Sequence, residues 1–140
     1  MEIKSYDYLP QEAKYIREKV FVEEQGFENE FDDVDGFATH LVALDCGKPV
    51  ATCRFFQKDD TQTYVLGRIA VLKEYRGLKV GARLIAEVEK ALCGKAERIL
   101  IHAQVRAQGF YEKQGYMPFG DKDEEENQPH VWMTKTIGKR

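Results

Sequence analysis

The 140-residue chain has few of the residues that build disulfide frameworks, metal centres or membrane spans. Its three cysteines show no Cys-x-x-Cys spacing, and its three histidines lie far apart in the sequence. We therefore expect neither a disulfide scaffold nor a bound metal, and free thiols fit a reducing, cytoplasmic location. No uncharged apolar run approaches the roughly 18 residues of a membrane helix, and the first residues lack the pattern of a secretory signal.

Charges of the two signs are nearly balanced, with 21 basic and 24 acidic side chains and a formal net charge of -3. A mildly acidic chain is a poor match for nucleic acid or for an anionic membrane surface, so we expect neither partner. Hydrophobic residues make up 43% of the chain, which is enough for one sizeable core. The length and the lack of a linker predict one domain over residues 1–140.

The spacing of apolar residues predicts a mixture of strands and helices. The predicted strands cover 3–8, 39–46, 50–56, 63–72, 98–104, 117–119 and 130–137, and the predicted helices cover 11–22, 77–95 and 106–114. This order fits neither strict strand–helix alternation nor an all-strand fold, so we expect an α+β fold with a mixed sheet covered by helices. The apolar run Ile69-Ala70-Val71 predicts burial on both faces of its strand.

Two acidic segments are predicted to connect the regular elements, the first as an ordered loop or a short helical turn and the second as a turn. Residues 27–36 contain too many acids to bury, although Phe27 and Phe31 are suited to anchor the segment. Residues 121–127 are expected to form a charged, solvated turn, with attraction of a cationic substrate as the alternative. Arg54 and Arg68 on predicted strands are interpreted as paired cations rather than as substrate ligands.

Three further side chains with reactive groups are given structural interpretations. Cys46 and Cys53 are in principle able to accept an acyl group, but no neighbouring motif supports an activated thiol. Both are therefore interpreted as small core residues of a strand. His102 is interpreted in the same way, as a structural histidine on its strand.

The most informative segment joins a predicted strand to the long helix that is predicted to begin at Gly77. The first amides of a helix lack intrahelical partners, and the helix dipole adds partial positive charge there. Gly77 and Gly81 allow close approach to the backbone, and Arg76 and Lys79 add charge, so this turn is suited to bind a phosphate. On spacing alone, the segment also fits an ordinary helix start with turn glycines, and it lacks the Gly-Lys-Ser/Thr of a Walker loop.

The segment Arg76-Gly77-Leu78-Lys79-Val80-Gly81, followed by Ala82, resembles the coenzyme A loop of the GNAT family of N-acetyltransferases. Residues 104–116, Gln-Val-Arg-Ala-Gln-Gly-Phe-Tyr-Glu-Lys-Gln-Gly-Tyr, resemble a second motif of that family. The order of predicted elements also matches, and the first half of the chain resembles a small bacterial group, the ElaA-like proteins. Two positions depart from the pattern: Lys79 replaces the usual central glycine, and Gln104 stands where asparagine is common.

The resemblance implies the GNAT fold and direct transfer of an acetyl group from acetyl-CoA to an amine of a small molecule or peptide. It implies that the pantetheine arm binds strand backbone and that the diphosphate binds the turn before the helix. The cofactor-binding residues that it assigns are Ile69, Ala70, Val71, Arg76, Gly77, Leu78, Lys79, Val80, Gly81, Ala82 and Gln104. A non-catalytic acyl-CoA-binding module is the alternative function, and an interaction domain that binds no coenzyme is a third.

The resemblance also assigns the proton-transfer groups. Tyr111 matches the family's general acid, since a phenol is suited to protonate a departing thiolate. Glu24 and His40 are the first candidates for the general base, and Glu23 and Asp35 are further candidates from the segment that borders the acceptor site in the family. Family members often form homodimers.

Overall fold

The computed structural model describes residues 1–59 and 61–138, within which seven strands form one sheet in the order β1-β2-β3-β4-β5-β7-β6. The strands are β1 (Glu2–Tyr6), β2 (Thr39–Asp45), β3 (Lys48–Gln57), β4 (Thr63–Val71), β5 (Arg98–Gln104), β6 (Met117–Glu125) and β7 (Gln128–Thr136). Neighbouring strands are antiparallel except for β4 and β5, which are parallel. The predicted α+β fold with a mixed sheet is confirmed.

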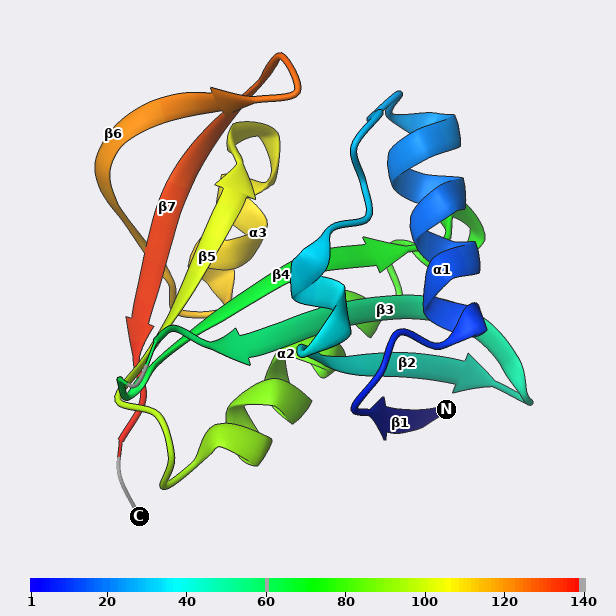
Figure 1. The fold of residues 1–140 in the computed structure, drawn as a ribbon, viewed down its shortest axis with the longest axis horizontal. Helices are drawn as coiled ribbons and strands as arrows, with labels where there is room; N and C mark the ends of the chain where they lie inside the picture. The colour runs from blue at the N-terminus through cyan, green and yellow to red at the C-terminus, as the bar shows by residue number, and fades with distance from the viewer. Residues whose placement is uncertain (60, 139–140) are drawn as a thin grey trace.

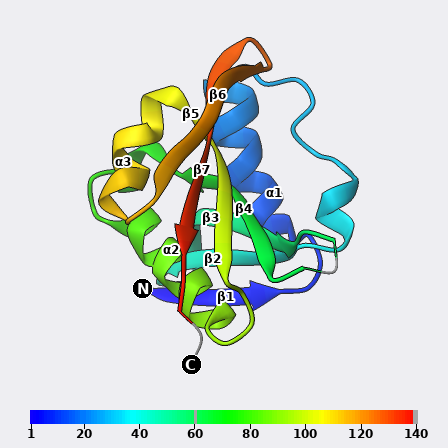
Figure 2. The ribbon, with the colours of Figure 1, turned by 90° about the vertical axis from the view of Figure 1, so that its left-hand side faces the viewer.

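Three α-helices, α1 (Gln11–Arg17), α2 (Val80–Leu92) and α3 (Gln108–Lys113), cover the two faces of the sheet (Figure 2). Helix α1, which continues as a π-helical segment over Glu18–Glu24, packs with Val42 and Leu44 of β2. Helix α2 packs with Leu41 and Ala43, the alternate residues of the same strand, so it lies on the opposite face. Among the described residues, no helix combines the length and the apolar character needed to cross a membrane.

Strands β4 and β5 pair only at their beginnings. Parallel pairing joins residues 63–65 to residues 98–100 and then stops. Beyond this point β4 stays paired with β3, whereas β5 pairs with β7, and Figure 1 shows the two halves of the sheet diverging. In the part of the chain that the structure describes, the β4 backbone from Leu66 to Val71 therefore has no partner strand on the side of β5.

This separation overturns one prediction about burial. Ala70 is buried as predicted, but Ile69 and Val71 are only half-buried, because β5 has left the side of β4 before these residues. The strand is also irregular at this point: Arg68 has a φ of 51°, and the register with β3 shifts between Thr52 and Arg54. A bulge of this kind bends a strand locally and is typical of sites next to functional clefts.

The predicted turn over residues 121–127 is also wrong. Strand β6 extends through Glu125, and a two-residue turn, Glu126-Asn127, joins it to β7. Both turn residues have positive φ, 52° and 63°, as a type I′ hairpin turn requires. Strand β6 is the last strand of the sheet, where charged side chains are tolerated and discourage pairing with another chain.

The acidic segment 27–36 is buried more deeply than its composition predicts. Glu30 and Asp35 are only 3% and 5% exposed, so the expectation that the acids of this segment stay unburied is wrong for both. Arg17 of α1, which is 1% exposed, donates from Nε to Glu30 at 2.8 Å and from Nη1 to Asp35 at 2.7 Å. The arginine supplies the opposite charge that allows carboxylates to leave water.

Two arginines of the sheet complete this ionic network. Arg54 of β3 lies 2.7 Å from Asp32 and 2.8 Å from Asp35, and Arg68 of β4 lies 3.0 Å from Glu30. Burial by itself would raise the pKa of Asp35, but the hydrogen bonds and charges of the arginines lower it to about 2. The interpretation of Arg54 and Arg68 as paired cations is confirmed, and their pairing holds the 27–36 segment against the sheet.

Candidate active site

A cleft of about 400 Å³ opens where β4 and β5 separate. One wall is formed by residues 65–69 of β4, and a second by the acidic segment 27–36 with Glu30 and Asp32. The opposite wall comes from β5, α3 and the β6–β7 hairpin, and its lining side chains include His102, Gln104, Tyr111, Glu125, His130 and Trp132. The cleft therefore combines open strand backbone with polar and titratable groups, as an acyl-transfer site requires.

Tyr111 lies in α3 and lines this cleft. Its side chain is 9% exposed and packs edge-on against Phe110, with the ring centroids 5.1 Å apart. Burial raises the pKa of the phenol, so the hydroxyl keeps its proton at neutral pH, as a proton donor must. Its place in the cleft suits the general acid that the resemblance assigns, and that role stays a prediction.

The turn before α2 has the backbone shape of an anion-binding turn. Gly77 and Lys79 have φ values of 82° and 64°, and these left-handed residues delay the helix to Val80 rather than the predicted Gly77. The amide of Arg83 donates to the Lys79 carbonyl at 3.1 Å. The amides of residues 80–82 precede that bond, and such amides have no carbonyl partner within the helix.

Gly81 has a packing role in this turn. A Cβ atom at this position would lie 3.2 Å from Cζ of Phe110 and 3.8 Å from Cγ2 of Val71. The close packing of α2 against α3 and β4 therefore disfavours a side chain at this position, because the Phe110 ring would have to move by a few tenths of an ångström. This reason differs from the close approach of a ligand that the sequence suggests, and it makes Gly81 a poor position at which to test phosphate binding.

Lys79→Gly is expected to raise the free energy of unfolding by about 0.5–1 kcal/mol. A side chain in the left-handed region costs roughly 1–2 kcal/mol, and the greater freedom of glycine in the unfolded chain cancels part of this gain. Urea denaturation measures the change. Lys79→Ala is the matched control, because it removes the charge and keeps the strain; equal stabilisation by both variants would show that backbone strain is not the cause.

Arg76 and Glu24 form an ion pair beside the turn. The guanidinium lies 2.6 Å from Glu24, and its Nε donates to the Val71 carbonyl at 3.0 Å. The hydrogen bond from Arg76 lowers the pKa of Glu24, which makes this carboxylate a weaker base. Arg76 therefore connects the end of β4 to the segment after α1, and its predicted phosphate contact would add to these bonds.

The predicted coenzyme residues fall on three neighbouring parts of the fold. Ile69 lines the cleft, and Ala70 and Val71 follow it along β4. Residues 76–82 form the turn and the start of α2, where Leu78 is 62% exposed. Gln104, at the end of β5, lines the cleft and donates from Nε2 to Gln25 at 2.9 Å.

The four residues considered as general bases do not line the cleft among the described residues. His40 is 1% exposed with Nε2 3.1 Å from the Asp35 carbonyl oxygen, and burial lowers its pKa. Asp35 belongs to the ionic network, and Glu24 is paired with Arg76. Glu23 is paired with Lys19 on the surface. Glu24 lines a neighbouring pocket together with Arg76 and Arg106, and a base role for any of the four residues stays a prediction.

Of the two cysteines considered as acyl acceptors, Cys53 is a buried structural residue, as predicted. Its side chain is 1% exposed in β3, and burial raises the pKa of the thiol. A thiol of this kind is a poor nucleophile, because the reactive species is the thiolate. Cys46 is exposed in the turn after β2, outside the residues that line the cleft, so it is not the core residue that the sequence suggests.

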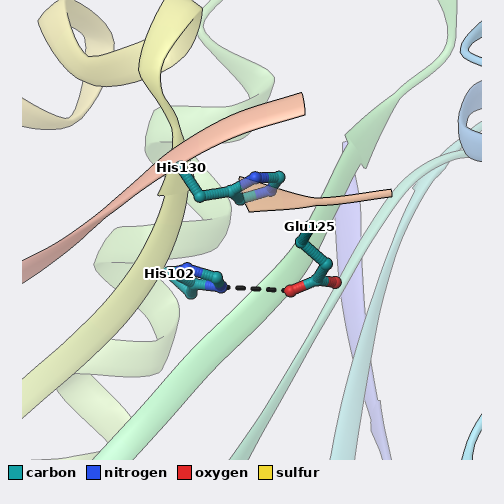
Figure 3. A group of neighbouring side chains, drawn as sticks. All are labelled: His102, Glu125 and His130. Carbon is teal, nitrogen blue, oxygen red and sulfur yellow. Dashed lines mark hydrogen bonds and ion pairs between the residues drawn. The ribbon is translucent and has the colours of Figure 1, made fainter. Parts of the chain in front are cut away.

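Sequence reasoning missed a group of three side chains in the cleft, His102, Glu125 and His130 (Figure 3). Their nitrogen and oxygen atoms lie within 4.8 Å of one another, although β5, β6 and β7 contribute one residue each. The pairing register places His102 opposite Trp132 and Gln104 opposite His130. Alternation along the two strands would have suggested a shared face, but the register that brings the residues together is not visible in the sequence.

The geometry agrees with comparisons with known proteins. The family model described as "Acetyltransferase (GNAT) domain" matches residues 5–137. YjcF of Bacillus subtilis, named an uncharacterized N-acetyltransferase, is 38% identical over 128 residues, which cover 89% of this chain and 90% of that protein.

Solved structures agree with this match. The crystal structure of Escherichia coli ElaA superposes with a TM-score of 0.84 at 26% identity and covers 96% of this chain and 98% of that chain. An aminoglycoside 6'-N-acetyltransferase complexed with coenzyme A has a TM-score of 0.79 at 18% identity, over 100% of this chain and 99% of that chain, and so shares the fold. From the matched family model, the curated relative and the resemblance to ElaA, the chain belongs to the GNAT family of acetyltransferases.

Proposed function

We propose that the protein is an acetyl-CoA-dependent N-acetyltransferase that transfers the acetyl group directly to an amine of a small molecule or peptide. The separation of β4 from β5 is the observation that carries the proposal, because it opens strand backbone beside a cleft that Tyr111 lines. A pantetheine arm is able to hydrogen-bond to such an edge like an added strand. The presence of coenzyme A in a protein of the same fold supports this choice of acyl donor.

In the proposed complex, the diphosphate lies at the first amides of α2, where helix geometry provides unpaired donors and partial positive charge. A backbone N–H of residues 69–71 polarises the thioester carbonyl and stabilises the oxyanion that forms on attack by the amine. Tyr111 donates its proton to the sulfur as the C–S bond breaks.

Titration calorimetry of the full chain with acetyl-CoA tests the donor site. We expect saturable binding that Leu78→Glu weakens about tenfold or more, because a negative charge is added beside the diphosphate. Leu78→Gln is the matched neutral control, and the native side chain is largely exposed, so neither variant disturbs the core. Absence of saturable binding to the unmodified protein would remove the proposal.

A thiol-release assay with acetyl-CoA and tyramine, putrescine or a lysine-containing peptide tests the transfer. Release of free thiol that depends on an amine is the expected result. If acetyl-CoA binds and none of the amines is acetylated at a rate above the uncatalysed one, the alternative of a non-catalytic acyl-CoA-binding module becomes the better description.

Several expectations from the sequence belong to this proposal. They are one domain over residues 1–140, a cytoplasmic location, assembly as a homodimer, and no nucleic acid or membrane among the partners. The cytoplasmic location is supported by three free cysteines, which suit a reducing compartment.

A further inference from the structure

We propose that His130 is the general base that removes a proton from the acceptor ammonium, an inference that rests on the transfer proposed above. His130 lies near the start of β7, is 4% exposed and lines the cleft together with Tyr111. It therefore meets the first requirement of a catalytic base, which is a place beside the site where the amine and the thioester meet.

The hydrogen bond of the ring fixes which nitrogen is able to accept a proton. Nδ1 of His130 lies 2.8 Å from the carbonyl oxygen of Gln128. A carbonyl oxygen only accepts, so Nδ1 carries the hydrogen and the lone pair of the neutral ring is on Nε2. Within residues 1–59 and 61–138, Nε2 has no hydrogen-bond partner. A base whose second nitrogen is held by another group is the arrangement found in nucleophile-activating sites.

Charged groups from the neighbouring elements surround this ring. Asp123 of β6 is opposite His130 in the sheet register, and Glu125 lies within 4.8 Å. His102 of β5 stacks on His130 with ring centroids 4.7 Å apart, and its nitrogens lie 2.8 Å from Asp123 and 3.1 Å from Glu125. Arg106 lines the cleft near the end of β5.

The negative charges of Asp123 and Glu125 in β6 are the feature of these surroundings that favours proton transfer to His130. Neither Asp123 nor Glu125 is paired with a lysine or an arginine in the described part of the chain, whereas Glu30 and Asp32 on the opposite wall are paired. Both carboxylates contact His102. Because no lysine or arginine of the described residues neutralises them, they attract an ammonium group to the ring and compensate the positive charge that the ring gains with the proton. Trp132, stacked 4.6 Å from His102, keeps the imidazoles in place.

Two imidazoles and one carboxylate are also a ligand set for zinc. The rings of His102 and His130 lie with their centroids 4.7 Å apart and are tilted by 33°. Figure 3 shows the two rings one above the other, which is not the edge-on approach of two imidazoles to a shared ion. Glu125 is moreover engaged by His102 rather than turned toward a shared position. The arrangement therefore favours proton transfer over metal binding, and a zinc-dependent activity is the outcome that would reverse this preference.

Atoms and charge balance in the proposed step. The acceptor ammonium gives one proton to Nε2 of His130, which returns it to solvent, and the neutral nitrogen attacks the acetyl carbon. The C–N bond forms, the C–S bond breaks and the electron pair of that bond leaves with the sulfur, which takes its proton from Tyr111. The nitrogen loses its remaining extra proton, which restores Tyr111, and the products are an amide, free coenzyme A and one released proton.

His130→Asn is the variant that tests this role. The amide nitrogen of asparagine occupies about the place of Nδ1 and keeps the bond to Gln128, while the basic nitrogen is lost. For the amine that the unmodified protein acetylates fastest, we expect transfer at neutral pH to fall by about 10²-fold or more. With hydroxylamine, which is uncharged at neutral pH and needs no base, the rate is expected to stay within about threefold.

The loss of rate in His130→Asn with the alkyl amine is also expected to become roughly tenfold smaller for each unit that the pH is raised. At higher pH, more of the amine in solution is already neutral and needs no base in the protein. An equal fall with both nucleophiles, or no fall with either, would overturn the base assignment. Loss of wild-type activity in chelator with recovery in zinc would overturn it in favour of a metal. A wild-type protein that acetylates neither nucleophile would remove the proposed function and the base together, whereas a selective loss supports both.

Discussion

Arg17→Met is expected to lower the free energy of unfolding by about 3–5 kcal/mol, because two carboxylates stay buried after their shared cation is removed. Arg17 donates to Glu30 through Nε and through Nη2 to its carbonyl oxygen, and its two terminal nitrogens hold both oxygens of Asp35. Methionine fills much of the same volume without a charge. Urea denaturation followed by circular dichroism measures the loss.

Lys19→Met, two residues further along, is the matched control. Lys19 pairs with Glu23 at 3.3 Å on the surface, where an ion pair contributes about 0.5 kcal/mol or less. A loss of less than about 1 kcal/mol for Arg17→Met would show that Arg54 and Arg68 alone compensate the buried acids, and that Arg17 is not the central cation of the network.

Tyr111→Phe is expected to lower the turnover of acetyl transfer by about 10²-fold, because the thiolate then departs without a proton donor. The affinity for acetyl-CoA should change by less than about twofold, since the ring and its packing against Phe110 remain. Thiol release gives the turnover, and calorimetry gives the affinity.

Tyr116→Phe is the matched control for Tyr111→Phe. Tyr116 is also buried, and its hydroxyl donates to Glu89 at 2.9 Å, but the residue does not line the cleft among the described residues. It should lose some stability and keep its turnover. Unchanged turnover in Tyr111→Phe, or an equal loss in both variants, would contradict the assignment of Tyr111 as the acid.

Local patterns in the sequence were sufficient for most of the fold. The apolar stripe of Val80, Leu84, Ile85, Val88 and Leu92 predicts α2, and all five side chains are buried in the structure. Errors arose where long-range contacts decide the outcome. The uninterrupted run of charged residues at 121–125 carries no strand signal, and only pairing with β7 makes that segment a strand. Likewise, burial of Glu30 depends on arginines that are far away in sequence.

In the candidate site, too, the features set by local sequence were predictable and those set by long-range contacts were not. The turn before α2 and Tyr111 lie in continuous motifs, so both were predicted from the sequence, and their roles stay predictions. The cluster of His102, Glu125 and His130 joins three strands, and its members are visible as a group only when the register is known. The base candidates from the first half of the chain lie outside the residues that line the cleft and have partners elsewhere, and their role stays a prediction.

The open edge of β4 has an evolutionary consequence. An acyl donor that is held by main-chain amides and carbonyls depends on backbone shape, and point mutation cannot delete a main-chain group except by introducing proline. If the donor binds as proposed, side chains along this edge are free to change while donor binding is kept. Main-chain recognition of this kind would leave the outer walls of the cleft to adapt to different acceptors.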